Sequence, residues 1–181
     1  KILNAGSSNT DYGGINIDIQ NKAGIHFVSD VHDLPFSDSS FDIVVLTAVL
    51  QYCLSPHRVS FEIHRVLKPG GYVYVDAPFV QPYCIDTPDL FRFTKDGLIS
   101  VFNKEFTVLE CNASIPTGSA LAYYLQSLCG NLNNRYISYA LNIILSIIVL
   151  PLTLIKSCNT NVAGALYLIG KKKSNLGFQH H

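Results

Sequence analysis

Short apolar runs alternate with polar, glycine-containing segments along most of the chain. Two stretches between these runs repeat apolar residues at helical spacing. Residues 56–67 begin at Pro56, which suits a first helical turn, and residues 94–102 begin at Thr94, which can cap a helix. Seven other runs have the length and the β-branched or aromatic content of strands, at residues 2–5, 15–19, 26–29, 41–46, 72–76, 106–111 and 165–170.

This order of elements predicts an α/β fold, a Rossmann-like doubly wound sheet of seven strands. Parallel strands in such a sheet end at a common edge, where ligands bind. Only residues 6–14 separate the first two strands, whereas a crossover between parallel neighbours needs roughly ten to twelve residues or more. We therefore expect the first crossover helix to be reduced or missing, which leaves one face of the sheet in need of another cover.

The composition predicts one domain, residues 1–181, with no nucleic-acid partner. Thirteen basic residues balance thirteen acidic ones, whereas proteins that bind nucleic acid usually show a basic face. Five widely spaced cysteines without a Cys-x-x-Cys pair argue against a disulfide framework or a metal site and favour a reducing compartment. No cleavable signal peptide opens the chain, so we expect a cytoplasmic location.

An apolar, mainly helical insertion is expected at residues 113–161, between the sixth and last strands. Tyr136 to Ile155 contains no charged residue. Burial against protein is the first interpretation, as a cover for the bare sheet face or as a homodimer interface; contact with a membrane surface, which would make the protein peripheral there, is the second. A true membrane span ranks third, because a proline interrupts the run and three polar residues share one helical stripe: Pro151, Ser138, Asn142 and Ser146.

Residues 30–76 carry a series of closely spaced motifs. After Asp30 come Leu34-Pro35-Phe36, Ser40-Phe41-Asp42 and Arg65-Val66-Leu67-Lys68-Pro69-Gly70-Gly71. This series resembles the class I S-adenosylmethionine-dependent methyltransferases, in the methyltransferase type 11-like branch. The resemblance extends more weakly over residues 2–94 and resumes near residue 165. It implies S-adenosylmethionine as cofactor and an antiparallel last strand.

The resemblance also implies where the cofactor binds. A glycine after the first strand would let the backbone approach the methionine part, and an aspartate ending the second strand would accept hydrogen bonds from the ribose hydroxyls. An aspartate and the backbone after it would lie at the adenine, and a threonine after the fourth strand beneath the transferable methyl. An asparagine replaces the family's acidic residue on the first strand. These cofactor-binding residues are Asn4, Gly6, Ser7, Asp18, Asp30, Val31 and Thr47.

Each of these assignments has a structural alternative. Asp18 and Asp30 could be ordinary loop carboxylates, and Gly6 could serve a plain turn. Arg65 is expected to be structural, and His32 to be a solvated loop residue. On the substrate side, the segment after the fifth strand resembles the family's substrate wall. No single catalytic base stands out among the candidates near the reacting edge, which are Tyr52, Asp76, Tyr83, Asp86, Asp89 and Arg92, with Tyr52, Tyr83 and Arg92 preferred on the substrate side.

The sequence therefore predicts an S-adenosylmethionine-dependent methyltransferase that acts on a small-molecule, glycan or lipid-linked acceptor. A non-catalytic binding or assembly module with the same fold is the alternative, motivated by Asn4, Ser8 and the missing helix. A nicotinamide dehydrogenase is disfavoured, because no Gly-x-Gly-x-x-Gly opens a helix after the first strand.

Overall fold

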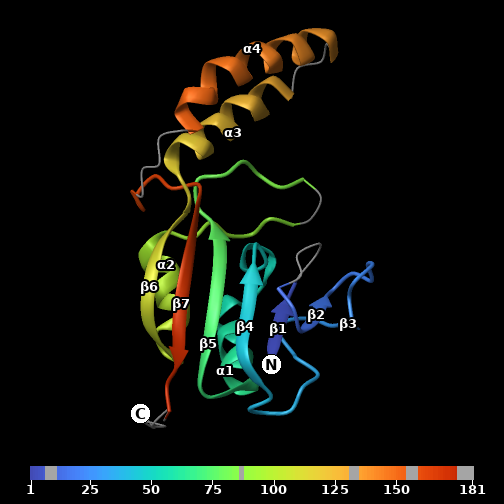
Figure 1. Cartoon of the computed structure of the whole chain (residues 1–181), viewed down its shortest axis with the longest axis vertical. Coiled ribbons are helices and arrows are strands. Elements are labelled where there is room, and N and C mark those ends of the chain that lie inside the picture. Colours follow the sequence, from blue (N-terminus) through green and yellow to red (C-terminus); the bar gives the residue numbers. More distant parts are fainter. Residues whose placement is uncertain (7–11, 86–87, 131–134, 154–158, 175–181) are drawn as a thin grey trace.

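A seven-stranded sheet forms the centre of the protein (Figure 1). The structure is a computed structural model that describes residues 1–6, 12–85, 88–130, 135–153 and 159–174. The strand order is β3-β2-β1-β4-β5-β7-β6, with β1 to β5 parallel and β7 antiparallel to both of its neighbours. The strands are β1 Ile2–Ala5, β2 Ile15–Asp18, β3 Phe27–Val28, β4 Phe41–Thr47, β5 Leu67–Pro78, β6 Phe106–Ile115 and β7 Ala165–Lys172.

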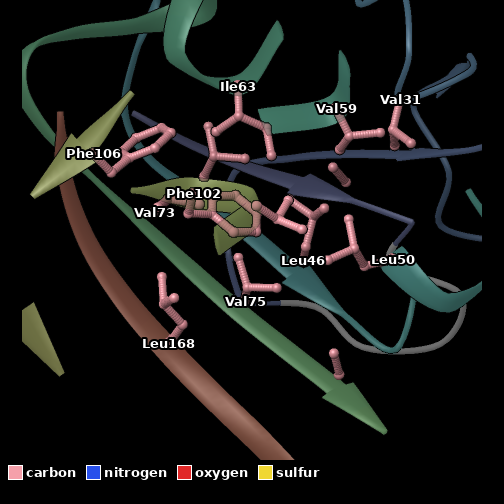
Figure 2. Packing of buried hydrophobic residues seen from close by; sticks show 14 of the residues in the cluster. Val31, Leu46, Leu50, Val59, Ile63, Val73, Val75, Phe102, Phe106 and Leu168 are labelled. Atoms are coloured by element: carbon pink, nitrogen blue, oxygen red, sulfur yellow. The ribbon is translucent and has the colours of Figure 1, made fainter. Parts of the chain in front are cut away.

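Helices α1 (Pro56–Val66) and α2 (Lys95–Phe102) form where the sequence predicts them. Pro56 opens α1, and the hydroxyl of Thr94 caps α2 by accepting a hydrogen bond from the Gly97 amide at 3.1 Å. Both helices pack on the same face of the sheet (Figure 1). Figure 2 shows the resulting core, in which side chains of α1 and α2 meet those of the central strands: Val59, Ile63, Phe102, Val73, Val75 and Leu168.

The opposite face of the sheet carries none of the helices in the described part of the chain (Figure 1). Of the residues joining β1 to β2, 12–14 form no helix and 7–11 lie outside the description. Ile43 and Tyr72, on the central strands, are 37% and 40% exposed as a consequence. The expectation of a sheet with one uncovered face is thus confirmed for the described residues.

Strand β5 begins at Leu67, five residues before the predicted start. Leu67 pairs with Phe41 across a bulge, and the Pro-Gly-Gly turn lies inside the strand. A β-carbon on Gly71 would lie 2.9 Å from the carbonyl oxygen of Asp42, so β4 and β5 approach too closely here for any residue other than glycine. The family motif therefore serves the contact between β4 and β5.

Helices α3 (Thr117–Gly130) and α4 (Arg135–Thr153) form an antiparallel hairpin between β6 and β7. The hairpin extends beyond the carboxyl edge of the sheet and does not lie over the bare face (Figure 1). The prediction that the insertion covers that face is therefore wrong: the two helices pack on each other. None of the helices in the described residues has the length and apolarity needed to cross a membrane.

Candidate functional site

Strand register brings four residues that the sequence named as site candidates into one row. Four paired residues lie at one level across the parallel strands: Ile17, Ala5, Leu46 and Val75. The next residue along each segment forms the row at the carboxyl edge, which we call the rim: Asp18, Gly6, Thr47 and Asp76. Three of these were predicted cofactor residues. Asp30 follows β3, whose Val28 pairs with Asp18, so it extends the rim on its outer side.

Gly6 has a backbone that only glycine adopts readily. Its φ is +73°, and its amide donates to the carbonyl oxygen of Ile17 at 2.8 Å. A β-carbon at this position would lie 2.2 Å from Cγ2 of Val49. The packing of the loop after β4 therefore already requires a glycine here, in addition to any ligand.

Asn4 is buried next to a second asparagine on β2. Its side-chain amide donates to Oδ1 of Asn16 at 2.6 Å, and the Asn16 amide donates to the carbonyl oxygen of Gly24 at 3.2 Å. Asn16 was not predicted, although its place two residues before Asp18 puts it on the same face of the strand. The pair holds β1 and β2 together at the position where the family carries an acid.

Asp18 ends β2 and is only 9% exposed. Its Oδ1 accepts a hydrogen bond from the Gln20 amide at 2.9 Å, and its backbone oxygen accepts one from Ser29 at 3.0 Å. These bonds fix the turn after the strand. The carboxylate is therefore held in one orientation at the rim.

Asp30 and His32 form a hydrogen-bonded pair on the adenine side. The backbone amide of His32 donates to Oδ1 of Asp30 at 2.9 Å, and the ring Nδ1 lies 2.6 Å from the same oxygen. Burial alone would raise the pKa of Asp30, but the hydrogen bonds from His32 and the nearby charge of Arg58 lower it overall. Nε2 of His32 accepts from the Ser55 amide at 3.2 Å. The expectation of a solvated His32 is wrong, because this ring links the loop to the start of α1. Val31, between the two, is buried in the core.

Thr47, the last residue of β4, pairs with Asp76, two residues before the end of β5. Ala48 follows with φ +54°, a conformation stabilised by its amide donating to the Asp76 carbonyl at 2.9 Å. Burial raises the pKa of the Asp76 carboxyl. This carboxylate is consequently a stronger base than an aspartate in water.

A shallow pocket opens beside the rim in the segment after β5. It is lined by Gln81, Tyr83, Asp89, Leu90, Phe91 and Arg92. Arg92 pairs with Asp89, whose pKa is lowered by that hydrogen bond, and also donates to the Pro82 carbonyl at 2.9 Å. The guanidinium thus fastens the segment, while Tyr83 is 66% exposed at its surface.

The short helix η1 (Leu50–Tyr52) joins this segment to the rim. The carbonyl oxygen of Gln51 accepts hydrogen bonds from the amides of Leu90 and Phe91, at 2.9 and 3.2 Å. Its side-chain Nε2 donates to the Ala48 carbonyl at 2.9 Å. Tyr52, predicted on the substrate side, follows on the same helix. Gln51 escaped prediction because a buried glutamine has no sequence signature of its own.

Unsatisfied polar atoms gather around the rim. Within the described ranges, three buried side-chain atoms at or next to β1, β4 and η1 have no hydrogen-bond partner: Oδ1 of Asn4, Oγ1 of Thr47 and Oε1 of Gln51. A buried polar atom without a partner is costly. The arrangement therefore fits a ligand with several hydrogen-bond donors, such as the ammonium and hydroxyl groups of S-adenosylmethionine. Ser7 lies outside the described residues, and those described contain no group of three or more His, Cys, Asp or Glu suited to a metal ion.

The parallel sheet with an antiparallel β7, together with this rim, defines the class I S-adenosylmethionine-dependent methyltransferase fold. The same fold is present in an S-adenosylmethionine-dependent methyltransferase from Thermotoga maritima, with a TM-score of 0.64 and 15% sequence identity. The superposition covers 96% of this chain and 82% of that one.

Sequence comparison finds local similarity to known methyltransferases. The model of the methyltransferase domain matches residues 13–75. A malonyl-[acyl-carrier protein] O-methyltransferase of Marinomonas sp. is 47% identical over 49 residues, 26% of this chain and 18% of that protein. A phthiotriol/phenolphthiotriol dimycocerosates methyltransferase of Mycobacterium ulcerans is 48% identical over 60 residues, 31% of this chain and 21% of that protein. The chain thus matches only about a fifth of the length of these relatives. The similarity to the methyltransferase domain is therefore local, covering residues 13–75 of the 181 in this chain.

Proposed function

We propose that the rim binds S-adenosylmethionine and that the protein transfers its methyl group to a small-molecule or lipid-linked acceptor. The observation that carries this proposal is the row of Asp18, Gly6 and Thr47 at one sheet edge, with partnerless buried oxygens beside it. The relatives named for malonyl-carrier and dimycocerosate methylation support an acceptor of this class.

Each rim residue has a distinct role in the proposal. The oriented carboxylate of Asp18 accepts hydrogen bonds from the two ribose hydroxyls, which its two oxygens suit. Gly6 leaves the backbone open for the methionine part, and Oδ1 of Asn4 accepts from its ammonium. Asp30, kept ionised by His32, and the backbone of Val31 face the adenine.

S-adenosylmethionine supplies an electrophilic methyl group when bound. The protein's task is to hold the acceptor in line with that methyl and to keep water away. In the proposal, η1 and the pocket beside the rim do this, since Gln51 joins them to the end of β4. Asp76 is placed in the rim and made more basic by burial, so it can take the proton that an oxygen or nitrogen acceptor loses.

Calorimetry with the full protein tests the cofactor site. Asp18→Asn should weaken S-adenosylmethionine binding about 10- to 100-fold, because a hydrogen bond to a charged group contributes about 1.5–3 kcal/mol. Asp96→Asn, in the first turn of α2 on the covered side of the sheet, is the matched control and should bind like the wild type.

Two outcomes would count against the proposal. Unchanged affinity of Asp18→Asn would remove the ribose role of that carboxylate. Absence of binding by the wild type to both S-adenosylmethionine and S-adenosylhomocysteine would favour the alternative, a non-catalytic module. Asn4 motivates that alternative, because its neutral amide pairs with Asn16 where the family carries an acid.

A further inference from the structure

The α3–α4 hairpin exposes its apolar side chains outward. On α4, seven large side chains are between 47% and 85% exposed: Tyr136, Ile137, Tyr139, Ile143, Ile144, Ile147 and Ile148. At 100° per residue these positions span roughly half of the helix circumference. Leu121 and Leu128 continue the apolar surface on α3, at 47% and 65% exposure. A helix this apolar on its free side is expected to be covered.

Polar side chains on the facing sides of α3 and α4 have partners within the hairpin. The amide of Gln126 on α3 donates to the hydroxyl of Ser146 on α4 at 3.3 Å. Ser146 donates to the Asn142 carbonyl at 2.7 Å, and the Asn142 amide donates to the Ser138 carbonyl at 3.0 Å. Asn142 and Ser146 of the polar stripe noted in the sequence are therefore hydrogen-bonded within the hairpin. This is the reverse of a helix that faces water, and it is the arrangement that helices take in hydrocarbon.

Charge is almost absent from the two helices. Between residues 117 and 153 the sequence contains one charged residue, Arg135, at the start of α4. A protein partner would cover one stripe of such a hairpin, whereas lipid can cover its whole free surface. The breadth of the apolar surface and the hydrogen bonds within the hairpin therefore favour lipid, rather than a second protein, as the partner that covers this surface.

We propose that the α3–α4 hairpin inserts into one leaflet of a lipid bilayer as a monotopic anchor. The chain leaves the sheet at Ile115 and returns at Ala165, which are paired neighbours, so the hairpin re-emerges on the side where it entered. An α-helix of 19 residues is about 28 Å long. None of the described helices is suited to cross the bilayer, in agreement with insertion from one side.

The hairpin and the rim share one edge of the sheet (Figure 1). The hydroxyl of Tyr124 on α3 donates to the carbonyl oxygen of Gln81, in the wall of the pocket, at 2.9 Å. Insertion therefore turns the pocket toward the membrane surface. This step rests on the proposed function. Of the two kinds of acceptor proposed there, small-molecule or lipid-linked, the orientation favours the lipid-linked one.

A tryptophan reporter tests insertion, because the sequence contains no tryptophan. Ile147→Trp should shift its fluorescence to the blue with phosphatidylcholine vesicles and should be quenched by brominated acyl chains. Leu54→Trp, at an 82% exposed position before α1, is the control and should show neither change. Equal behaviour of the two variants, or a water-like spectrum of both, would overturn the proposal.

Sedimentation with neutral vesicles gives an independent test. Ile144→Gln/Ile147→Gln/Ile148→Gln should lower the vesicle-bound fraction at least tenfold, and 0.5 M salt should leave wild-type binding intact. Leu54→Gln/Leu109→Gln, two leucines exposed elsewhere, should bind like the wild type. Wild type that stays in the supernatant as a stable dimer, with a triple variant that is monomeric, would assign the surface to self-association instead. Unchanged calorimetric S-adenosylmethionine binding by the triple variant keeps this test separate from that of the proposed function.

Discussion

Gly6 meets two separate demands at the rim, a positive φ and a close contact with Val49. Gly6→Ala should lower the free energy of unfolding by about 2–5 kcal/mol, since a left-handed alanine and an overpacked contact both cost energy. Gly24 has a similar φ of +84° with open space around its Cα. Gly24→Ala should therefore cost only ~1–2 kcal/mol. Urea unfolding of both variants measures the difference, and equal losses would show that Val49 moves aside.

Among individual residues, the sequence predicted the position of those that directly follow a strand. Asp18 and Thr47 were predictable because each follows an apolar run, and parallel strands share an edge. The contacts of Asn4 with Asn16, and of His32 with Asp30 and Ser55, were not predictable in this way. They depend on which loops meet in space, and no spacing in the chain encodes that.

Glu62 and Arg65 connect α1 to the loop before β4. Arg65 donates to Glu62 and to the carbonyl oxygens of Leu34 and Phe36, and Glu62 accepts from the Leu34 amide at 3.0 Å. These hydrogen bonds confirm the structural role expected for Arg65. The Leu-Pro-Phe and Arg-Val-Leu motifs therefore belong to one contact between elements.

Stability should fall in acid through this contact. The Arg65 hydrogen bond lowers the pKa of Glu62 below its ordinary value of 4.5, so the folded state favours the ionised form. This contribution is complete above pH 4.5 and is lost as the pH falls through the lowered pKa. The difference in unfolding free energy between wild type and Glu62→Gln should therefore shrink from pH 6 to pH 3.5, measured by urea unfolding. A difference that stays constant over this range would contradict the assignment.

Element types were predictable and some boundaries were not. Helix α1 ends one residue before the predicted end, and β5 starts five residues early because Leu67 pairs with Phe41. Strand β6 continues to Ile115, which pairs with Ala165. Both extensions come from pairing with a neighbouring strand, an interaction that local periodicity does not report.

On the scale of the whole molecule, the described residues form the sheet with its two packed helices and a hairpin that contacts mainly itself. The sequence indicated that the insertion is apolar and that one sheet face is bare, and it suggested that the first covers the second. In the structure the hairpin lies away from the bare sheet face. The direction in which a hairpin leaves a sheet depends on the geometry of its two connections, which composition does not contain.

Excision of the hairpin should preserve the sheet. The amide of Gly164 donates to the Ile115 carbonyl at 2.9 Å, so β6 and β7 are already joined at the point where the hairpin departs. Replacing residues 117–162 with Asn-Gly should leave one unfolding transition and lose no more than ~2 kcal/mol, since shorter loops close at lower entropic cost. Circular dichroism and urea unfolding would check this. Loss of cooperative unfolding would show that the hairpin belongs to the core.

The antiparallel pairing of β7 has a consequence for biosynthesis. Strand β5 spans Leu67–Pro78, yet its partner on one side is made only at Ala165–Lys172, after both hairpin helices. During translation an unpaired strand edge and an apolar helical hairpin are therefore exposed at the same time. Both features promote aggregation. Nascent chains arrested before residue 165 should be held by chaperones or at a bilayer until the sheet can close.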